Sequence, residues 1–92
     1  MKELFLPTDK AYIKKERQKA KELKKTLWWK NKLNKKECYY CEKKFDIKNL
    51  SMDHLVPLVR GGRSTKNNVV VACKKCNSEK KYKTLVEIRL NK

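Results

Sequence analysis

The first third of the chain follows a helical pattern of apolar and polar positions. No glycine or proline interrupts residues 8–33, and strong helix formers such as Lys, Glu, Ala and Leu dominate the segment. Pro7 precedes Thr8 and Asp9, either of which is a typical N-cap. The pattern predicts one long helix ending near Leu33. Its narrow, mostly apolar stripe comprises Ile13, Glu16, Ala20, Leu23 and Leu27.

The rest of the chain alternates short apolar runs with turns. Phe45 and Ile47 alternate as in a strand, and residues 50–56 form a second strand-like run that Pro57 limits. A glycine-rich loop follows at residues 60–63, and a short apolar run at residues 69–72 leads into helical sequence from Cys73. Strand, loop, strand and helix in this order predict a small α+β fold.

Two adjacent tryptophans, Trp28 and Trp29, close the predicted N-terminal helix. Neighbouring residues on a helix point about 100° apart, so both rings cannot lie on one narrow stripe. Trp brings a large apolar surface into a small core, which favours one ring docking the helix onto the rest of the chain. The alternative is a stacking or phosphate contact.

Four cysteines form two matched pairs, Cys38 with Cys41 and Cys73 with Cys76. With 92 residues, one domain with a modest core is expected, so an additional source of stability is needed. The chain begins without an apolar signal stretch and has no run long enough to span a membrane. A reducing, cytoplasmic compartment follows as the expectation. There, paired CxxC motifs favour one tetrahedral Zn²⁺ site over two disulfides.

The net charge of +16 indicates a polyanionic partner. Basic residues exceed acidic ones both in residues 1–36 and in residues 37–92, so the charge is not confined to a tail. The basic helix can lie along phosphates, pack on the core, or do both. Charge alone does not separate DNA from RNA, and an over-charged solvated surface is the simpler alternative.

The sole histidine, His54, directly follows Asp53. A carboxylate is a hard ligand suited to Mg²⁺ or Mn²⁺, and a histidine can activate water. On a strand the two side chains point to opposite faces, so they serve one site only if the strand bends or ends there. Phosphodiester hydrolysis requires such a base and such a cation.

The motifs DHxxP, GG, NxV and CxxCNxxK occur in this order at residues 53–57, 61–62, 68–70 and 73–80. Together with the first CxxC, this pattern over residues 38–83 resembles the HNH endonuclease family. It is most similar to a branch with a CxxC before the DH and a CxxCN after it. The resemblance implies a ββα-metal core held together by a structural zinc.

The resemblance also implies residue roles. His54 corresponds to the general base, Asp53 to a ligand of the catalytic metal, and Asn68 to the asparagine that ties the loop to the strand and orients the histidine. Asn77 corresponds to the second ligand of the catalytic metal, at a position where the namesake residue is histidine. Asn67 flanks Asn68 and is the alternative middle asparagine. The zinc ligands correspond to Cys38, Cys41, Cys73 and Cys76.

The combined expectation is a small ββα-metal core stapled by one four-cysteine zinc site and preceded by a long basic helix. Residues 1–36 form a helical extension packed on the core, and residues 37–92 form the nuclease domain. The predicted function is cleavage of DNA, by nicking or through both strands, with Mg²⁺ or Mn²⁺ held by Asp53 and Asn77. RNA is the other possible substrate, and a non-catalytic zinc module that binds nucleic acid is the alternative function. We expect a cytoplasmic protein, encoded by a bacterium or a phage, that acts without a membrane as a monomer or transient dimer.

Overall fold

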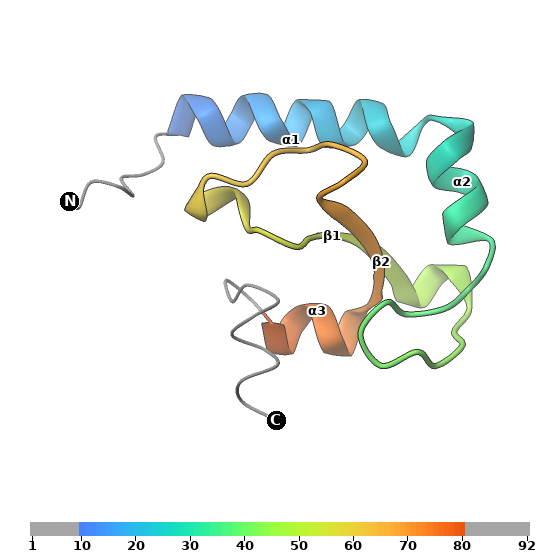
Figure 1. The fold of residues 1–92 in the computed structure, drawn as a ribbon. Helices are drawn as coiled ribbons and strands as arrows, with labels where there is room; N and C mark the ends of the chain where they lie inside the picture. The colour runs from blue at the N-terminus through green and yellow to red at the C-terminus, as the bar shows by residue number, and fades with distance from the viewer. Residues whose placement is uncertain (1–9, 81–92) are drawn as a thin grey trace.

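The computed structural model describes residues 10–80, and its N-terminal part is two helices joined by a sharp corner (Figure 1). Helix α1 spans Lys10–Lys24 and α2 spans Leu27–Leu33. The prediction of a single long helix is therefore wrong. The proposed N-caps Thr8 and Asp9 lie outside the described residues.

Thr26 accounts for the corner between α1 and α2. Its hydroxyl donates to the Leu23 carbonyl at 2.7 Å and accepts from the Trp29 backbone N–H at 3.2 Å. One side chain thus closes the first helix and caps the second. Because the axis turns here, Leu27 leaves the predicted stripe and is 72% exposed, whereas Ala20 stays buried.

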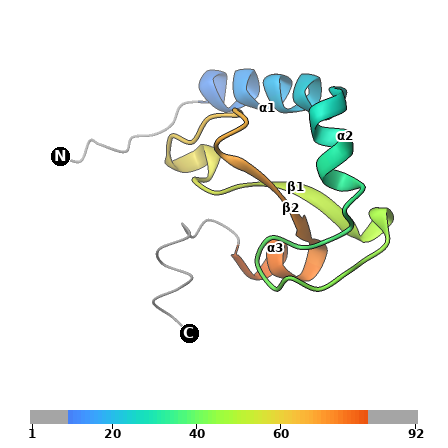
Figure 2. The ribbon, with the colours of Figure 1, turned by 45° about the vertical axis from the view of Figure 1, so that its right-hand side comes forward.

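An antiparallel pair of strands forms the centre of the fold. Strand β1 (Leu50–His54) pairs with β2 (Val69–Cys73), with Leu50 opposite Cys73 and His54 opposite Val69. All five residues of β2 are buried. The two views show why, since the strands lie between α1 and α2 on one side and α3 (Lys74–Lys80) on the other (Figures 1 and 2). The predicted order of strand, loop, strand and helix is confirmed.

The segment before β1 differs from the prediction. Residues Ile47–Asn49 form the short 3-10 helix η2 instead of a strand, and Ile47 is exposed. Phe45 packs against the core, and its N–H donates to the Lys36 carbonyl at 2.8 Å beside an isolated bridge between Glu37 and Lys44. Two alternating apolar residues are too few to specify a strand.

The tryptophan prediction is confirmed. Trp29 is 3% exposed and packs in the core with Cys38, Leu50 and Val69. Trp28 packs at the edge of this core, with the ammonium groups of Lys32 and Lys66 at 5.3 and 5.4 Å from its ring centroid. Within residues 10–80, no helix has the length and apolar character to cross a membrane.

Candidate active site and metal centre

The four cysteines come together at one end of the strand pair. Their sulfur atoms all lie within 4.8 Å of one another. A tetrahedral zinc with Zn–S bonds of about 2.3 Å has sulfur atoms ~3.8 Å apart, so the cluster is of the right size for one ion. The four cysteines are thus positioned to bind a metal ion, as the spacing predicted.

Backbone N–H groups donate hydrogen bonds to the Cys38 sulfur and favour its thiolate form. In the turn that begins at Cys38, the N–H groups of Tyr40 and Cys41 point at the Cys38 sulfur, at 3.3 and 3.5 Å. Burial opposes ionisation of this thiol, but the N–H groups outweigh burial and lower the pKa of Cys38 to about 7. Glu42 adopts a left-handed conformation that completes the turn, and Tyr39 N–H donates to the Val71 carbonyl of β2 at 2.8 Å.

A surface cavity of about 230 Å³ lies at the other end of β1. Asp53, His54 and Asn77 all line it, although they come from a strand and a helix. Asp53 and His54 leave the strand on opposite faces, but β1 ends at His54 and both residues reach the cavity rim. The remaining lining residues are Arg17, Met52, Pro57, Leu58, Val59 and Lys80.

The Asp53 carboxylate is buried between two donors. The Tyr40 hydroxyl donates to its Oδ2, and the Lys80 ammonium lies 3.4 Å from the same atom. Lys80 is itself buried and also donates to the His54 carbonyl at 2.7 Å. Burial and the Asp53 charge raise the pKa of Tyr40, so its hydroxyl stays protonated and remains a donor. Both of these contacts are made by Oδ2, so Oδ1 is the atom of Asp53 that could bind a cation.

The His54 ring is half-buried, and its Nε2 lies 2.9 Å from the Ser64 hydroxyl. Burial lowers the pKa of His54, while the nearby Asp53 carboxylate acts in the opposite direction. The net effect favours the neutral ring, which is the form able to accept a proton.

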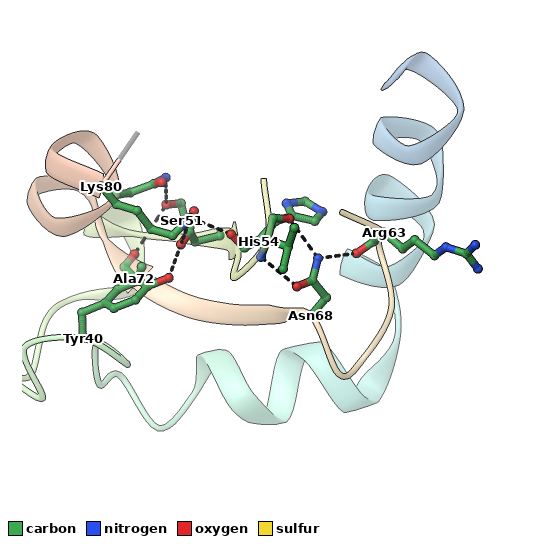
Figure 3. Close-up of polar contacts among 10 residues, drawn as sticks. Tyr40, Ser51, His54, Arg63, Asn68, Ala72 and Lys80 are labelled. Atoms are coloured by element: carbon green, nitrogen blue, oxygen red, sulfur yellow. Dashed lines mark hydrogen bonds and ion pairs between the residues drawn. The ribbon is translucent and has the colours of Figure 1, made fainter. Parts of the chain in front are cut away.

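Asn68 fastens the loop between the strands (Figure 3). Its Oδ1 accepts from Val56 N–H at 2.9 Å, and its Nδ2 donates to the carbonyls of Val56 and Arg63 at 3.1 and 2.8 Å. These bonds connect both ends of the loop to the start of β2. Asn67 is exposed, so the geometry favours Asn68 as the middle asparagine. Its contact with His54 is indirect, through the strand end.

Asn77 lies in the first turns of α3, directly after Cys76. Its Nδ2 donates to the Ser51 hydroxyl at 3.1 Å, and Ser51 lies next to the Ala72 carbonyl at 3.4 Å. The amide nitrogen is thereby held by the strand pair. The amide oxygen is the atom that can act as a metal ligand, so Asn77 and Asp53 provide two hard oxygen donors at one cavity.

The sequence profile of the HNH endonuclease family matches residues 38–91, more than half of the chain. The chain belongs to the HNH endonuclease family. It is also 38% identical over 45 residues to the CRISPR-associated endonuclease Cas9 of Corynebacterium diphtheriae. The aligned part is 48% of this chain and 4% of that protein, so the chain corresponds to a small part of its relative.

In this HNH protein, three further residues contribute to the site without a motif in the sequence to indicate them. Tyr40 lies inside the first CxxC turn and Ser64 in the loop between the strands, and neither belongs to a motif that points to the site. Glu16 is 3% exposed and hydrogen-bonded to Ser64, and the one signal for it was a carboxylate within a mostly apolar stripe. Glu16 and the cavity residue Arg17 both come from α1, outside the matched segment 38–91.

Proposed function

We propose that this HNH protein is a metal-dependent endonuclease that hydrolyses phosphodiester bonds in DNA, by nicking or by cutting both strands. The observation that carries the proposal is the shared cavity of Asp53, His54 and Asn77. It combines a neutral imidazole with two hard oxygen donors, which is the set of groups that hydrolysis of a phosphodiester requires.

His54 acts as the general base in this mechanism. It removes a proton from the water that attacks phosphorus, and the oxygen–phosphorus bond to the leaving sugar then breaks. Asp53 and Asn77 would hold a Mg²⁺ or Mn²⁺ ion, which would supply charge stabilisation for the leaving oxygen. Arg17 adds positive charge at the cavity, which favours a bound phosphate, whereas the charge of Lys80 is balanced by Asp53.

The cysteine cluster has a separate, structural role in the proposal. Four thiolates in a closed set favour Zn²⁺ and leave no ligand position for substrate. The hard oxygen donors of Asp53 and Asn77 favour Mg²⁺ or Mn²⁺ instead. Two different ions are therefore proposed for the two ends of β1.

The substrate proposal rests on charge and family. A net charge of +16 favours a polyanion, and an HNH endonuclease acts on nucleic acid. We place the protein in the cytoplasm of a bacterium or of a phage-infected cell, where thiols stay reduced. One catalytic site per chain nicks as a monomer, and cutting both strands requires a transient dimer or two encounters.

The test is cleavage of supercoiled plasmid by zinc-loaded protein in Mg²⁺ or Mn²⁺, with nicked and linear products separated on a gel. His54→Ala is expected to lower the rate by about 10²–10⁴-fold, the usual contribution of a general base. Asn68→Ala is expected to lower it as well, whereas its exposed neighbour Asn67→Ala provides the matched control.

Three outcomes contradict parts of the proposal. If wild-type protein leaves DNA and RNA intact in both metals, the protein is a non-catalytic zinc module that binds nucleic acid. If His54→Ala cuts as well as wild type, the assignment of His54 as the general base is wrong. If RNA is cut in strong preference to DNA, the substrate assignment is wrong. Retained zinc and an unchanged far-UV spectrum ensure that the variants are compared as folded proteins.

A further inference from the structure

The hydroxyl of Ser64 lies between the catalytic histidine and α1. Its Oγ is 2.9 Å from His54 Nε2 and 2.6 Å from the backbone carbonyl oxygen of Glu16. Ser64 is 8% exposed, so solvent does not compete freely for these contacts. Both distances are those of good hydrogen bonds.

A serine hydroxyl has one hydrogen to donate. The Glu16 carbonyl can only accept, and two acceptor oxygens 2.6 Å apart without a hydrogen between them would repel each other. The Ser64 hydrogen therefore points to Glu16, and Ser64 Oγ accepts from His54. It follows that His54 Nε2 carries the hydrogen and that Nδ1 has the free electron pair of the neutral ring.

Glu16 holds Ser64 at a second point. Its Oε1 accepts from the Ser64 backbone N–H at 2.8 Å, and its Oε2 lies 3.3 Å from the Lys19 ammonium. One turn earlier on α1, the Tyr12 hydroxyl lies 2.7 Å from the Gly62 carbonyl oxygen and 3.1 Å from that of Gly61. Side chains of α1 thus form hydrogen bonds with the loop on both sides of Arg63.

We propose that α1 positions the catalytic base, with Glu16 clamping Ser64 and Ser64 holding the His54 ring with Nδ1 presented to the attacking water. Glu16 and Ser64 are positioning residues, since they act through His54. The catalytic part of the inference rests on the proposed nuclease function, but the hydrogen-bond arrangement does not. The site then needs α1 to be complete, although α1 lies outside residues 38–91, the segment that matches the family.

Because His54 is the only histidine, selective ¹⁵N-histidine labelling gives the signals of one imidazole without assignment. Two-bond ¹H–¹⁵N spectra of the zinc-loaded full chain at about pH 8, where a free imidazole is neutral, should show the Nε2–H form. They should also show a slowly exchanging ring proton. Ser64→Ala should speed exchange of that proton and shift the Nε2 resonance, whereas Thr65→Ala, the exposed neighbouring hydroxyl, should change neither.

The plasmid assay provides a second readout. Ser64→Ala is expected to lower kcat about 10- to 100-fold with little change in KM, because the base is misplaced but the substrate surface is intact. Ser64→Thr retains the hydroxyl and should restore most of kcat. Glu16→Gln keeps an acceptor for the Ser64 N–H and should remain active. Glu16→Met leaves this N–H unpaired, so its kcat should fall as much as that of Ser64→Ala.

Nδ1–H in the wild-type ring, or an unchanged ring signal in Ser64→Ala, overturns the arrangement. Equal kcat for wild type and Ser64→Ala overturns the positioning role. If the wild-type protein cuts no nucleic acid, the nuclease proposal fails, and the ring signals still decide whether α1 holds His54.

Discussion

Replacement of Lys80 by Met is the most informative single change in the site. The Lys80 and Asp53 side chains are 2% and 8% exposed, and the ammonium nitrogen lies 3.4 Å from the carboxylate oxygen. Removing one partner of a buried ion pair costs about 3–5 kcal/mol, because the remaining charge is left without compensation. A chain of this size has a free energy of unfolding of about 5–14 kcal/mol. Lys80→Met is therefore expected to remove a large part of the stability.

A double-mutant cycle separates the pair from other effects of the substitution. Asp53→Asn alone leaves a buried ammonium, but the double variant leaves no buried charge, and the amide oxygen that Asp53→Asn introduces can still accept from Tyr40. The double variant should therefore be destabilised by clearly less than the sum of the single variants. Urea unfolding followed by circular dichroism, with zinc present throughout, measures all four free energies.

Divalent metal adds a test of Asp53 as a ligand. In Lys80→Met, a bound Mg²⁺ or Mn²⁺ neutralises the carboxylate that the ammonium no longer balances. Added metal should therefore raise the melting temperature of Lys80→Met more than that of wild type, and it should have no such effect in the double variant. A destabilisation of less than about 1 kcal/mol, typical of an exposed pair, or equal metal responses in all variants, would refute the reasoning.

Three further results are expected. Removing zinc with a chelator should unfold the protein, because a structural zinc site supplies about 10–16 kcal/mol, which is comparable with the whole free energy of unfolding. A folded far-UV spectrum without metal would contradict this. Activity should fall on the acid side only below the usual histidine value of about 6.5, because burial lowers the pKa of His54 and the ring stays neutral to lower pH; a kcat–pH profile that falls above that value would contradict it. Gly62→Ala should prevent stable folding, since an added Cβ would lie 1.8 Å from the Val56 carbonyl oxygen. Gly61→Ala meets no atom within 4 Å and should cost only about 1 kcal/mol of backbone strain at φ +87°, as thermal unfolding of the pair will show.

The strand pair and its following helix could be predicted because β2 is short, continuously apolar and flanked by turn residues. The corner at Thr26 could not. Helix propensities differ by only tenths of a kcal/mol among ordinary residues, so an uninterrupted helix and a threonine-capped break look alike in sequence. The packing of Trp29 into the core decides between them, and that contact is tertiary.

The candidate site divides in the same way. Asp53, His54, Asn68 and Asn77 stand at fixed spacings in a recognisable motif, so the sequence was sufficient to propose them. Tyr40 and Ser64 reach the site through contacts that span 13 and 10 residues, and the Glu16–Ser64 bond spans 48. No periodic pattern encodes such contacts. A carboxylate in a mostly apolar stripe is the one local sign, since a buried charge requires a partner.

The cysteine cluster does more than stabilise a small core, because both proposed ligands of the catalytic metal are attached to it. Tyr40 lies inside the first CxxC turn and donates to Asp53, and Asn77 directly follows Cys76. An ion bound by the cysteines would therefore set the position of the turn and of α3. Through them it would set the position of Asn77 and of the Tyr40 hydroxyl that holds Asp53. A two-ligand metal site needs its donors held to within about 0.5 Å. On this reasoning, a metal of different radius in the cysteine cluster would alter the affinity of the catalytic site without touching any of its ligands.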